Sequence, residues 1–307
     1  MTGTVTRSFT FLVNPASGGG AAPAAVVPVA KLLREGGATV DVTYSPGPKA
    51  MGALVDAAVS RGDVVASVGG DGMLSSLAGL VAKAGGTLAV VPAGRGNDFA
   101  RMLGLPGDPA ALAALLLETP PRLIDLVSLT LPGAAEPRVV AGSVYCGVDA
   151  RAGEIVDKAH WIPGKLQYPY AALRALATYK PGSYVVSVDG DERRFDAANI
   201  VVANSAYYGN GMKIAPSARV DDGLLDIVVI EAASKLELMR SLPKVYDGRH
   251  VDLPEVTVLT GKRVELRADA ARPVPVGGDG EPLGSLPTTS EEPAVVEVLP
   301  GALSVLA

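Results

Sequence analysis

The first third of the chain alternates short apolar segments, rich in β-branched residues, with longer segments rich in alanine and leucine. The short segments predict strands: FTFLV (9–13), ATVDVTY (38–44), DVVASV (63–68) and TLAVV (87–91). Residues 24–37, 49–62 and 73–86 between them have the composition of helices and end in glycine, as helix C-termini often do. This alternation predicts a parallel, Rossmann-like sheet with helices on both faces.

The pattern changes after Pro120-Pro121, where apolar alternation without long intervening helices takes over. It predicts strands within 123–131, 138–148, 183–195, 199–208, 223–231, 255–268 and 294–307, with a tight hairpin at VDGDE (188–192). Two helices are expected in this region, around 165–180 and 235–248, and 284–293 is expected to be a loop. The sequence therefore predicts an α/β domain, 1–125, followed by a mainly antiparallel β-sandwich domain, 126–307.

Composition narrows the class of protein. The 307 residues have a formal charge of −5, which argues against a nucleic-acid partner because such a protein needs a basic face. A single cysteine, Cys146, excludes an internal disulfide and fits a reducing cytoplasm, where we expect a buried strand thiol. Only two histidines are present, which argues against a histidine-based nucleophilic triad. No apolar run approaches the length of a membrane span.

Three polar, glycine-rich loops directly follow three of the predicted strands. They are NPASGGG (14–20), GGDG (69–72) and PAGRGND (92–98). Strands of a parallel sheet end at one edge, so these loops are expected to lie together, each opening a helix whose N-terminus favours a phosphate group. Any one loop alone is best explained as a turn. The fingerprints of P-loop NTPases, dinucleotide redox enzymes and protein kinases are absent from the sequence.

The second half contributes acidic turns. APSARVDDGLLDI (215–227) places three aspartates around a glycine, and GGDGE (277–281) repeats the earlier Gly-Asp-Gly pattern. Each is an ordinary turn sequence by itself. Beside a phosphate-binding half they suggest carboxylates that converge on a cleft, one for proton abstraction and others for magnesium.

These motifs, in this order, resemble the diacylglycerol kinase catalytic-domain family, which includes bacterial diacylglycerol kinases, YegS-like lipid kinases, and sphingosine and ceramide kinases. The resemblance covers nearly the whole chain and runs through NPASG, GGDG, PAGRGNDFAR, YCGVDA, NSAYYGNGMKIAPSARVDDGLLDI and GDGE. PAGRGNDFAR and APSARVDDGLLD are the specific elements, since GGDG is shared with NAD kinases. The implied fold is that of NAD kinases and diacylglycerol kinases.

The resemblance implies transfer of the γ-phosphoryl group of ATP to a lipid hydroxyl, with diacylglycerol as the default acceptor and phosphatidic acid as the product. It implies that Asp279 is the general base and that Asp98 lies near the metal and phosphates. It further implies a structural Mg²⁺ held by Asp222 and by the backbone carbonyls of Arg219 and Leu224. The implied nucleotide-binding residues are Asn14, Pro15, Ser17, Gly18, Gly69, Gly70, Asp71, Gly72, Met73, Gly94, Arg95, Gly96, Asn97 and Glu281.

The chain departs from the family pattern beside two of the loops. Met73 follows GGDG where a threonine is common, Ser75 and Ser76 stand where asparagine and glutamate are common, and Arg95 replaces a usual threonine. Arg95 is either a phosphate contact or a solvated loop charge. Two alternatives to a lipid kinase stay open at this point: an NAD kinase-like phosphotransferase, and a non-catalytic lipid- or nucleotide-binding regulator.

A lipid kinase without a span has to meet its substrate at the bilayer surface. Residues 160–184 gather aromatic and basic side chains, a composition that suits a membrane interface or a lipid entrance: Trp161, Lys165, Tyr168, Tyr170, Arg174, Tyr179, Lys180 and Tyr184. The alternative is a core-facing helix with ordinary solvated cations. We therefore expect a cytoplasmic protein peripheral to the membrane, and an unpaired edge strand of the β half would allow a homodimer.

Overall fold

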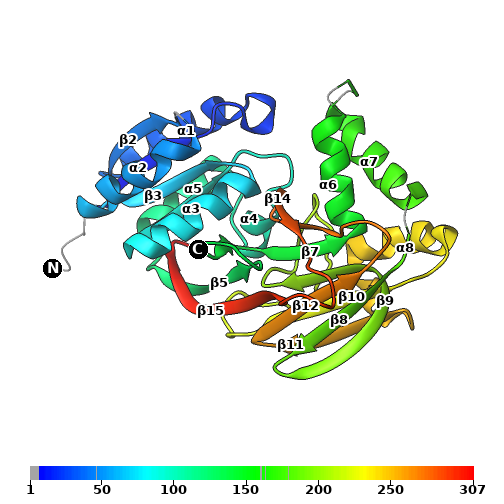
Figure 1. Cartoon of the computed structure of the whole chain (residues 1–307). Helices are drawn as coiled ribbons and strands as arrows, with labels where there is room; N and C mark the ends of the chain where they lie inside the picture. Colours follow the sequence, from blue (N-terminus) through cyan, green and yellow to red (C-terminus); the bar gives the residue numbers. More distant parts are fainter. Residues whose placement is uncertain (1–6, 46, 160, 163, 179) are drawn as a thin grey trace. The chain divides into compact units, whose positions relative to one another are not determined.

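The computed structural model describes residues 7–45, 47–159, 161, 162, 164–178 and 180–307 (Figure 1). The chain forms two compact units, Met1–Leu126 with Pro300–Ala307, and Val127–Leu299. The sequence placed Pro300–Ala307 with the second half. It lies in the first unit because the end of strand β15 (Ala294–Val305) pairs parallel to β4 (Thr87–Pro92), through Ser304 opposite Thr87 and Val305 opposite Leu88.

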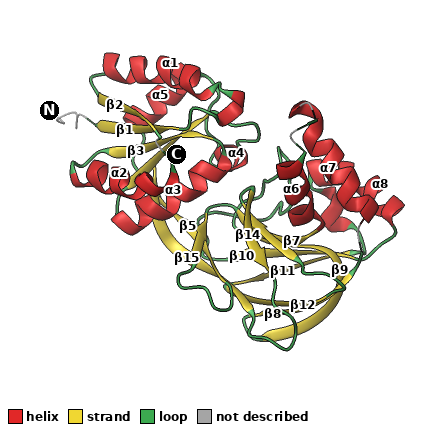
Figure 2. Cartoon of the chain, turned by 45° about the horizontal axis from the view of Figure 1, so that its top comes forward, coloured by secondary structure: helices red, strands yellow, loops and turns green. Residues whose placement is uncertain are grey.

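The first unit is the predicted α/β structure. Its parallel strands lie in the order β2-β1-β3-β4, formed by Thr39–Tyr44, Ser8–Val13, Val64–Gly69 and Thr87–Pro92. Helices α1 (Ala22–Glu35) and α5 (Pro109–Glu118) cover one face, and α2 (Pro48–Ser60) and α3 (Asp71–Ala84) cover the other (Figure 2). Phe9, Phe11 and Val13 of β1 pack with Leu33 of α1 and Leu116 of α5 in the core. The predicted parallel sheet with helices on both faces is confirmed.

The second unit is built from antiparallel pairs, as the apolar alternation predicts. Its main path runs β14-β13-β7-β9-β8-β12-β15, and β10 pairs with both β9 and β11. The strands are β5 (Arg122–Thr130), β6 (Arg138–Val140), β7 (Ser143–Gly147), β8 (Gly182–Val188), β9 (Asp191–Ala203), β10 (Leu225–Glu231), β11 (Val256–Gly261), β12 (Arg263–Asp269), β13 (Pro275–Gly278) and β14 (Glu281–Ser285).

The predicted hairpin at VDGDE connects β8 to β9. Val188 pairs with Asp191, so the turn contains only Asp189 and Gly190, whose φ values are 49° and 93°. A two-residue turn with positive φ at both positions matches the right-handed twist of the strands. The Asp189 carboxylate also accepts hydrogen bonds from the backbone N–H groups of Lys262 and Arg263, which ties this turn to the start of β12.

Three helices belong to the second unit: α6 (Val148–Lys158), α7 (Gly164–Thr178) and α8 (Lys235–Asp247). The last two were predicted, whereas α6 was not, because its first residues continue the strand-like YCGV sequence. Helices α6 and α7 pack together through the small side chains of Ala152, Ala171 and Ala175. All three helices are grouped beside the sheet (Figures 1 and 2).

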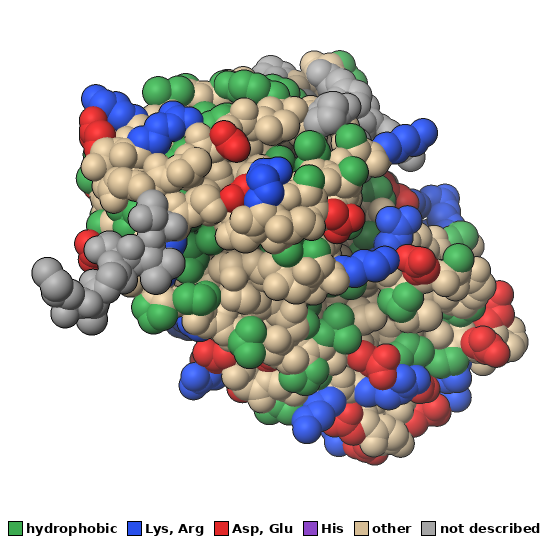
Figure 3. Space-filling view, turned by 90° about the vertical axis from the view of Figure 1, so that its left-hand side faces the viewer, with side chains coloured by type: hydrophobic (Ala, Val, Ile, Leu, Met, Phe, Trp, Pro, Cys, Tyr) green, Lys and Arg blue, Asp and Glu red, His purple; other side chains and the backbone are tan. Residues whose placement is uncertain are grey.

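Short helical segments complete the fold: α4 (Asp98–Met102) and the 3-10 turns Ser17–Gly19 and Arg249–Asp252. On the face drawn in Figure 3, acidic and basic side chains are interspersed. No helix within the described ranges is long and apolar enough to cross a membrane.

Candidate functional site

The three glycine-rich loops of the first unit meet at one edge of its sheet. A Cβ atom at Gly18 would lie 2.5 Å from the carbonyl oxygen of Ala93, and one at Gly94 would lie 2.4 Å from the Cα of Gly70. Contacts this short are possible only without a side chain. The glycines therefore serve close packing of loop against loop, and this leaves their backbone amides gathered at the carboxyl ends of β1, β3 and β4.

Hydrogen bonds fix the conformation of these loops. The backbone N–H of Ala93 donates to the carbonyl of Gly69 over 3.0 Å, which joins the second loop to the third. The side-chain oxygen of Asn97 accepts from the N–H of Gly94 at 2.8 Å, while Asn97 itself adopts a left-handed conformation with φ 51°. Asn14 braces the first loop similarly, because its side-chain oxygen accepts from the N–H of Ala16 at 3.0 Å.

Two carboxylates, those of Asp71 and Asp98, lie beside these loops. Asp71 occupies the first turn of α3, and one of its oxygens accepts a hydrogen bond from the N–H of Phe99 at 3.1 Å. A Cβ at Gly96 would lie 2.9 Å from a carboxylate oxygen of Asp98 and 3.1 Å from one of Asp71. The two acids therefore approach each other across Gly96. Asp98 is only 6% exposed, and Arg101 donates to it over 2.5 Å.

The other predicted nucleotide-binding residues of the first unit all lie on or next to these loops. Gly69 lies between Met73 and Ser17, because a Cβ there would be 3.0 Å from the Met73 sulfur and 3.2 Å from the Ser17 hydroxyl. Met73 thus packs on the loop where a hydroxyl was expected from the family pattern. Arg95 is exposed and forms no ion pair with a described residue. Glu281 lies in the second unit, at the start of β14, and is exposed.

Asp279 occupies the turn between β13 and β14 with φ 46°. Its carboxylate accepts hydrogen bonds from three consecutive backbone amides, those of Ala141 (2.8 Å), Gly142 (2.9 Å) and Ser143 (2.9 Å). These bonds fix the orientation of the carboxylate and hold the start of β7 against the turn. The role of general base is not visible in this geometry and stays a prediction.

The proposed metal ligand Asp222 lies in the exposed turn before β10. Its carboxylate accepts from the N–H of Leu224 at 3.1 Å, a local turn bond of the kind that aspartate commonly makes. Burial raises the pKa of its neighbour Asp226, the Ser217 hydroxyl lowers it, and the Asp222 charge raises it further. Within the described ranges, no three acidic, histidine or cysteine side chains cluster as a metal site. A metal at Asp222 would thus depend on backbone carbonyls.

A cavity of about 250 Å³ lies in the second unit between helices α6, α7 and α8 and the sheet. Its walls are mainly apolar and include Val148, Ala152, Leu176, Ile214, Leu238 and Val245. Polar residues line it as well: Glu237, Arg240, Ser241, His250 and Glu255. In addition, Asp149 accepts hydrogen bonds from the Tyr208 hydroxyl and from the Asn199 amide. A mainly apolar chamber with a fixed polar cluster suits a ligand that has an apolar body and a polar end.

Asp149 was not among the predicted site residues, although the YCGVDA motif contains it. Burial raises the pKa of its carboxyl group, while the hydrogen bonds from Tyr208 and Asn199 lower it. An acid directly after the end of a β-strand, as Asp149 is after β7, was a signal that the sequence offered. The sequence did not show that Asp149 lines the cavity, because helix α6, which places it there, was not predicted.

The sequence also made predictions for Cys146 and for the aromatic residues of 160–184. Cys146 is a buried strand thiol, as predicted, and burial raises its pKa to about 12, which makes it unreactive. Tyr184, counted with the aromatics of the possible lipid-entry segment, follows the core-facing alternative: it is 2% exposed and packs in the core of the second unit. Trp161 is 74% exposed and stacks edge-on against Tyr170. Tyr179 lies outside the described residues.

A parallel α/β unit that gathers three glycine-rich loops and two acids at one edge, followed by an antiparallel unit with an apolar cavity, defines a phosphate-binding enzyme class. The diacylglycerol kinase catalytic domain model matches residues 8–129, and the YegS C-terminal NAD kinase beta sandwich-like domain model matches residues 142–307. The chain therefore belongs to the diacylglycerol kinase catalytic-domain family, and it is a lipid kinase.

Individual relatives agree with this assignment. A diacylglycerol kinase of Mycobacterium tuberculosis is 34% identical over 306 residues, spanning 97% of this chain and 94% of the relative. A Pseudomonas aeruginosa protein named "Probable lipid kinase YegS-like" is 29% identical over 233 residues, spanning 75% and 74% of the two chains. A crystal structure of a diacylglycerol kinase from Bacillus anthracis shares the fold, with a TM-score of 0.67 at 19% identity and coverage of 98% and 96%.

Proposed function

We propose that this lipid kinase transfers the γ-phosphoryl group of ATP to the hydroxyl of a diacylglycerol-like lipid whose apolar part occupies the cavity beneath α6, α7 and α8. The observation that carries the acceptor assignment is the cavity itself, whose lining is mainly apolar and includes the hydrogen-bonded Asp149–Asn199–Tyr208 cluster. Family membership supports a lipid acceptor in general, and diacylglycerol is the acceptor named for the M. tuberculosis and Bacillus subtilis relatives.

The donor side of the proposal rests on the three loops of the first unit. Backbone amides at the N-terminus of α3 and in the third loop are suited to phosphate oxygens, because a helix N-terminus carries a partial positive charge. Arg95 is exposed on the third loop and has no acidic partner among the described residues, which leaves its guanidinium available for a phosphate. Loops locked by glycine contacts hold these donors in place before the nucleotide arrives, and positioning dominates phosphoryl transfer.

Asp71 and Asp98 are the residues that fit Mg²⁺. Their carboxylates converge on Gly96 beside the phosphate loops, and Mg²⁺ is commonly held by one or two carboxylates together with substrate phosphates. When bound there, the ion would neutralise charge on the transferring phosphoryl group. The Asp222 turn is the weaker candidate for Mg²⁺, because its carboxylate is exposed.

Asp279 is proposed to act either as the general base or as a group that positions the acceptor hydroxyl. The three amides of 141–143 hold its carboxylate in one orientation, as a base or a hydroxyl-positioning group requires. As a positioning group it would orient the lipid hydroxyl, whose proton would then pass to an oxygen of the transferring phosphoryl group while the bond to ADP breaks.

The membrane is the source of the lipid, and helix α8 offers a surface for it. Four exposed apolar side chains, which we call the α8 stripe, recur at helical spacing: Leu236, Met239, Leu242 and Tyr246. Basic side chains flank them at Lys235, Arg240 and Lys244. An amphipathic helix of this kind lies in the interface of a bilayer. Leu238 and Val245 of the same helix line the cavity, so a lipid would pass directly from the α8 stripe into the cavity.

The test of the proposed function is transfer of label from ATP to diacylglycerol, sphingosine, ceramide or phosphatidylglycerol in mixed micelles. Replacing Ser241, which lines the cavity, by leucine narrows the chamber without touching the loops of the first unit. We expect Ser241→Leu to lower label in the lipid with ATP affinity unchanged, and Ser60→Leu, at an exposed position of helix α2, to be neutral. Transfer that is equal in both variants would contradict the cavity assignment, and no labelled lipid would contradict the proposed reaction.

A further inference from the structure

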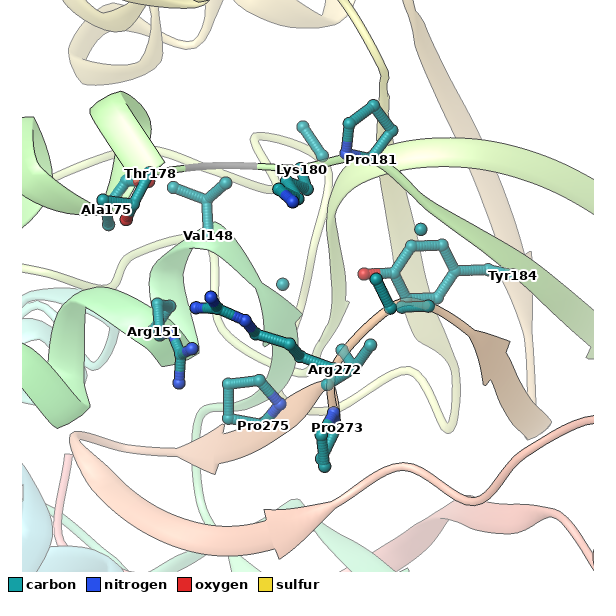
Figure 4. Close-up of a pocket in the computed structure, with 16 residues that line it drawn as sticks. Val148, Arg151, Ala175, Thr178, Lys180, Pro181, Tyr184, Arg272, Pro273 and Pro275 are labelled. Carbon is teal, nitrogen blue, oxygen red and sulfur yellow. The ribbon is translucent and has the colours of Figure 1, made fainter.

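A second, smaller pocket in the Val127–Leu299 unit gathers three cations. It has a volume of about 100 Å³ and is bordered by Arg151 of α6, Lys180 after α7, and Arg272 before β13. We call these three residues the cation pocket. Figure 4 shows Arg272 extending across the pocket toward Arg151, with Lys180 on the other side. The remaining lining is apolar or small, and it contains no acidic residue.

The charges of the pocket are incompletely compensated. Arg151 forms an ion pair with Glu154 over 2.6 Å, and Glu154 itself does not line the pocket. Lys180 and Arg272 form no ion pair with any residue in the described ranges. Three like charges around one small hollow repel each other, and an anion can reach Lys180 and Arg272 from solvent because both side chains are exposed. In a chain whose formal charge is −5, this concentration of positive charge is an exception that a bound anion would explain.

The backbone adds to the positive character of the pocket. Gly147 and Val148, at the N-terminus of the eleven-residue helix α6, line it, and the dipole of a helix is positive at that end. The C-terminal end of α7 also reaches the pocket and has the opposite sign. There, the Thr178 hydroxyl donates to the carbonyl of Arg174 at 2.7 Å, and the carbonyl of Ala175 lies 3.4 Å away as the alternative acceptor.

We propose that the cation pocket binds a phosphate group. Two guanidinium groups offer paired N–H donors that match phosphate oxygens, and a lysine ammonium adds a third charge. Val148 and Ala198 line both this pocket and the acceptor cavity, so the phosphate site adjoins a chamber for apolar chains. The phosphate belongs either to the headgroup of an anionic lipid or to a free phosphate compound. This site goes beyond the proposed function, since it requires no transfer reaction.

The experiment measures binding without turnover, so failure of the kinase proposal would not affect it. The full-length protein is mixed with vesicles of phosphatidylcholine alone or with phosphatidylglycerol added, and separately titrated with inorganic phosphate. The test variant is Lys180→Gln/Arg272→Gln. The matched control, Lys83→Gln/Arg194→Gln, removes the same charge from exposed positions outside the pocket. Thermal unfolding verifies that both variants are folded.

We expect the test variant to lose binding to phosphatidylglycerol vesicles by roughly tenfold or more, while the control keeps the wild-type affinity. Inorganic phosphate should weaken vesicle binding of the wild type and leave that of the test variant unchanged. Loss of phosphate binding alone, with equal vesicle binding, would support the site and identify a free phosphate compound as its ligand. Equal behaviour of the test variant, the control and the wild type in both arms would overturn the proposal.

Discussion

The carboxylates of Asp71 and Asp98 can approach each other because Gly96, which lies between them, has no side chain. Replacing it by alanine would put a Cβ at 2.9 Å from Asp98 and 3.1 Å from Asp71, so the carboxylates or the loop would have to move. A displacement of about 1 Å near reacting groups lowers turnover by ~100-fold. We predict a loss of this size in kcat for Gly96→Ala, measured with the best lipid acceptor.

Gly52 of helix α2 provides the matched control for this substitution. Its added Cβ would meet only the Leu80 side chain, at 3.9 Å, which is an ordinary contact. Gly52→Ala should leave kcat unchanged and raise the free energy of unfolding by about 0.5–1 kcal/mol. An equal kcat in the Gly96 and Gly52 variants would show that the two carboxylates do not act together.

Burial of the Asp149 carboxyl group makes the stability of the protein depend on pH. Because burial raises its pKa in the folded state above the value in the unfolded chain, its favourable contribution to stability is fully present below the unfolded pKa of about 3.9. That contribution is lost as pH rises through the folded pKa, since the folded protein then has to hold a buried charge.

Asp149→Asn removes this titration and keeps an oxygen that can accept from Tyr208 or Asn199. We predict that the variant is at least as stable as the wild type at pH 8, measured by thermal unfolding, whereas its advantage shrinks at acidic pH. If Asp149 bonds the acceptor hydroxyl, kcat/KM for the lipid falls by about 10- to 100-fold, with the KM for ATP unchanged. A simultaneous rise in the KM for ATP would place the effect elsewhere.

Asp279 requires a variant whose structural effect is measured separately from its effect on turnover. In Asp279→Asn an amide nitrogen faces backbone N–H groups that had carboxylate partners, so we predict a loss of stability of about 1–3 kcal/mol. If Asp279 is the base, the variant loses far more turnover than its unfolded fraction explains, and its affinity for ATP is unchanged. Turnover that decreases only in proportion to the folded fraction would identify Asp279 as a structural residue of the turn.

At the scale of single elements, helix α8 has one face toward the cavity and another toward solvent. Its Leu238 and Val245 side chains line the cavity, while Leu236 and Met239 are 55% and 43% exposed. Leu236→Gln/Met239→Gln should therefore reduce sedimentation with lipid vesicles, by about fivefold or more from the apolar area removed from the interface. Activity on a lipid dispersed in detergent should change little.

The control for α8 is Val27 on helix α1, which is 62% exposed in the first unit. Val27→Gln removes a comparable apolar side chain from another surface and should not affect vesicle binding. Identical sedimentation of wild type and α8 variant would exclude this helix as the membrane contact.

At the scale of the whole molecule, the C-terminal residues stabilise the unit that begins the chain. Leu306 is 2% exposed in the core of the first unit, and its N–H donates to the carbonyl of Leu88 at 3.0 Å. We predict that Leu306→Ala lowers the free energy of unfolding by about 2–5 kcal/mol, measured by denaturant titration. A loss below 1 kcal/mol, on the same scale as a surface substitution, would show that this strand end is dispensable.

Local patterns were sufficient for most elements. The strands 9–13, 63–68 and 87–91, the parallel α/β arrangement and the Asp189–Gly190 hairpin follow from periodicity and turn chemistry, which act within a few residues. Helix α6 was missed because a short apolar run after a strand is ambiguous between strand and helix, and its packing on α7 decides the matter. The sequence did not settle the burial of Tyr184 for a related reason, since composition does not tell which face of a segment meets the core.

The sequence by itself determined most of the elements and their order, the three loops and the family resemblance, because these depend on residues close together in the chain. Only the tertiary structure decided that Asp71 and Asp98 meet at Gly96, that the amides of 141–143 bind Asp279, and that Asp149 faces an apolar cavity. It also decided that Pro300–Ala307 joins the first unit. Each of these contacts joins distant segments or depends on how one packs against another, and packing of that kind is not encoded in any local pattern.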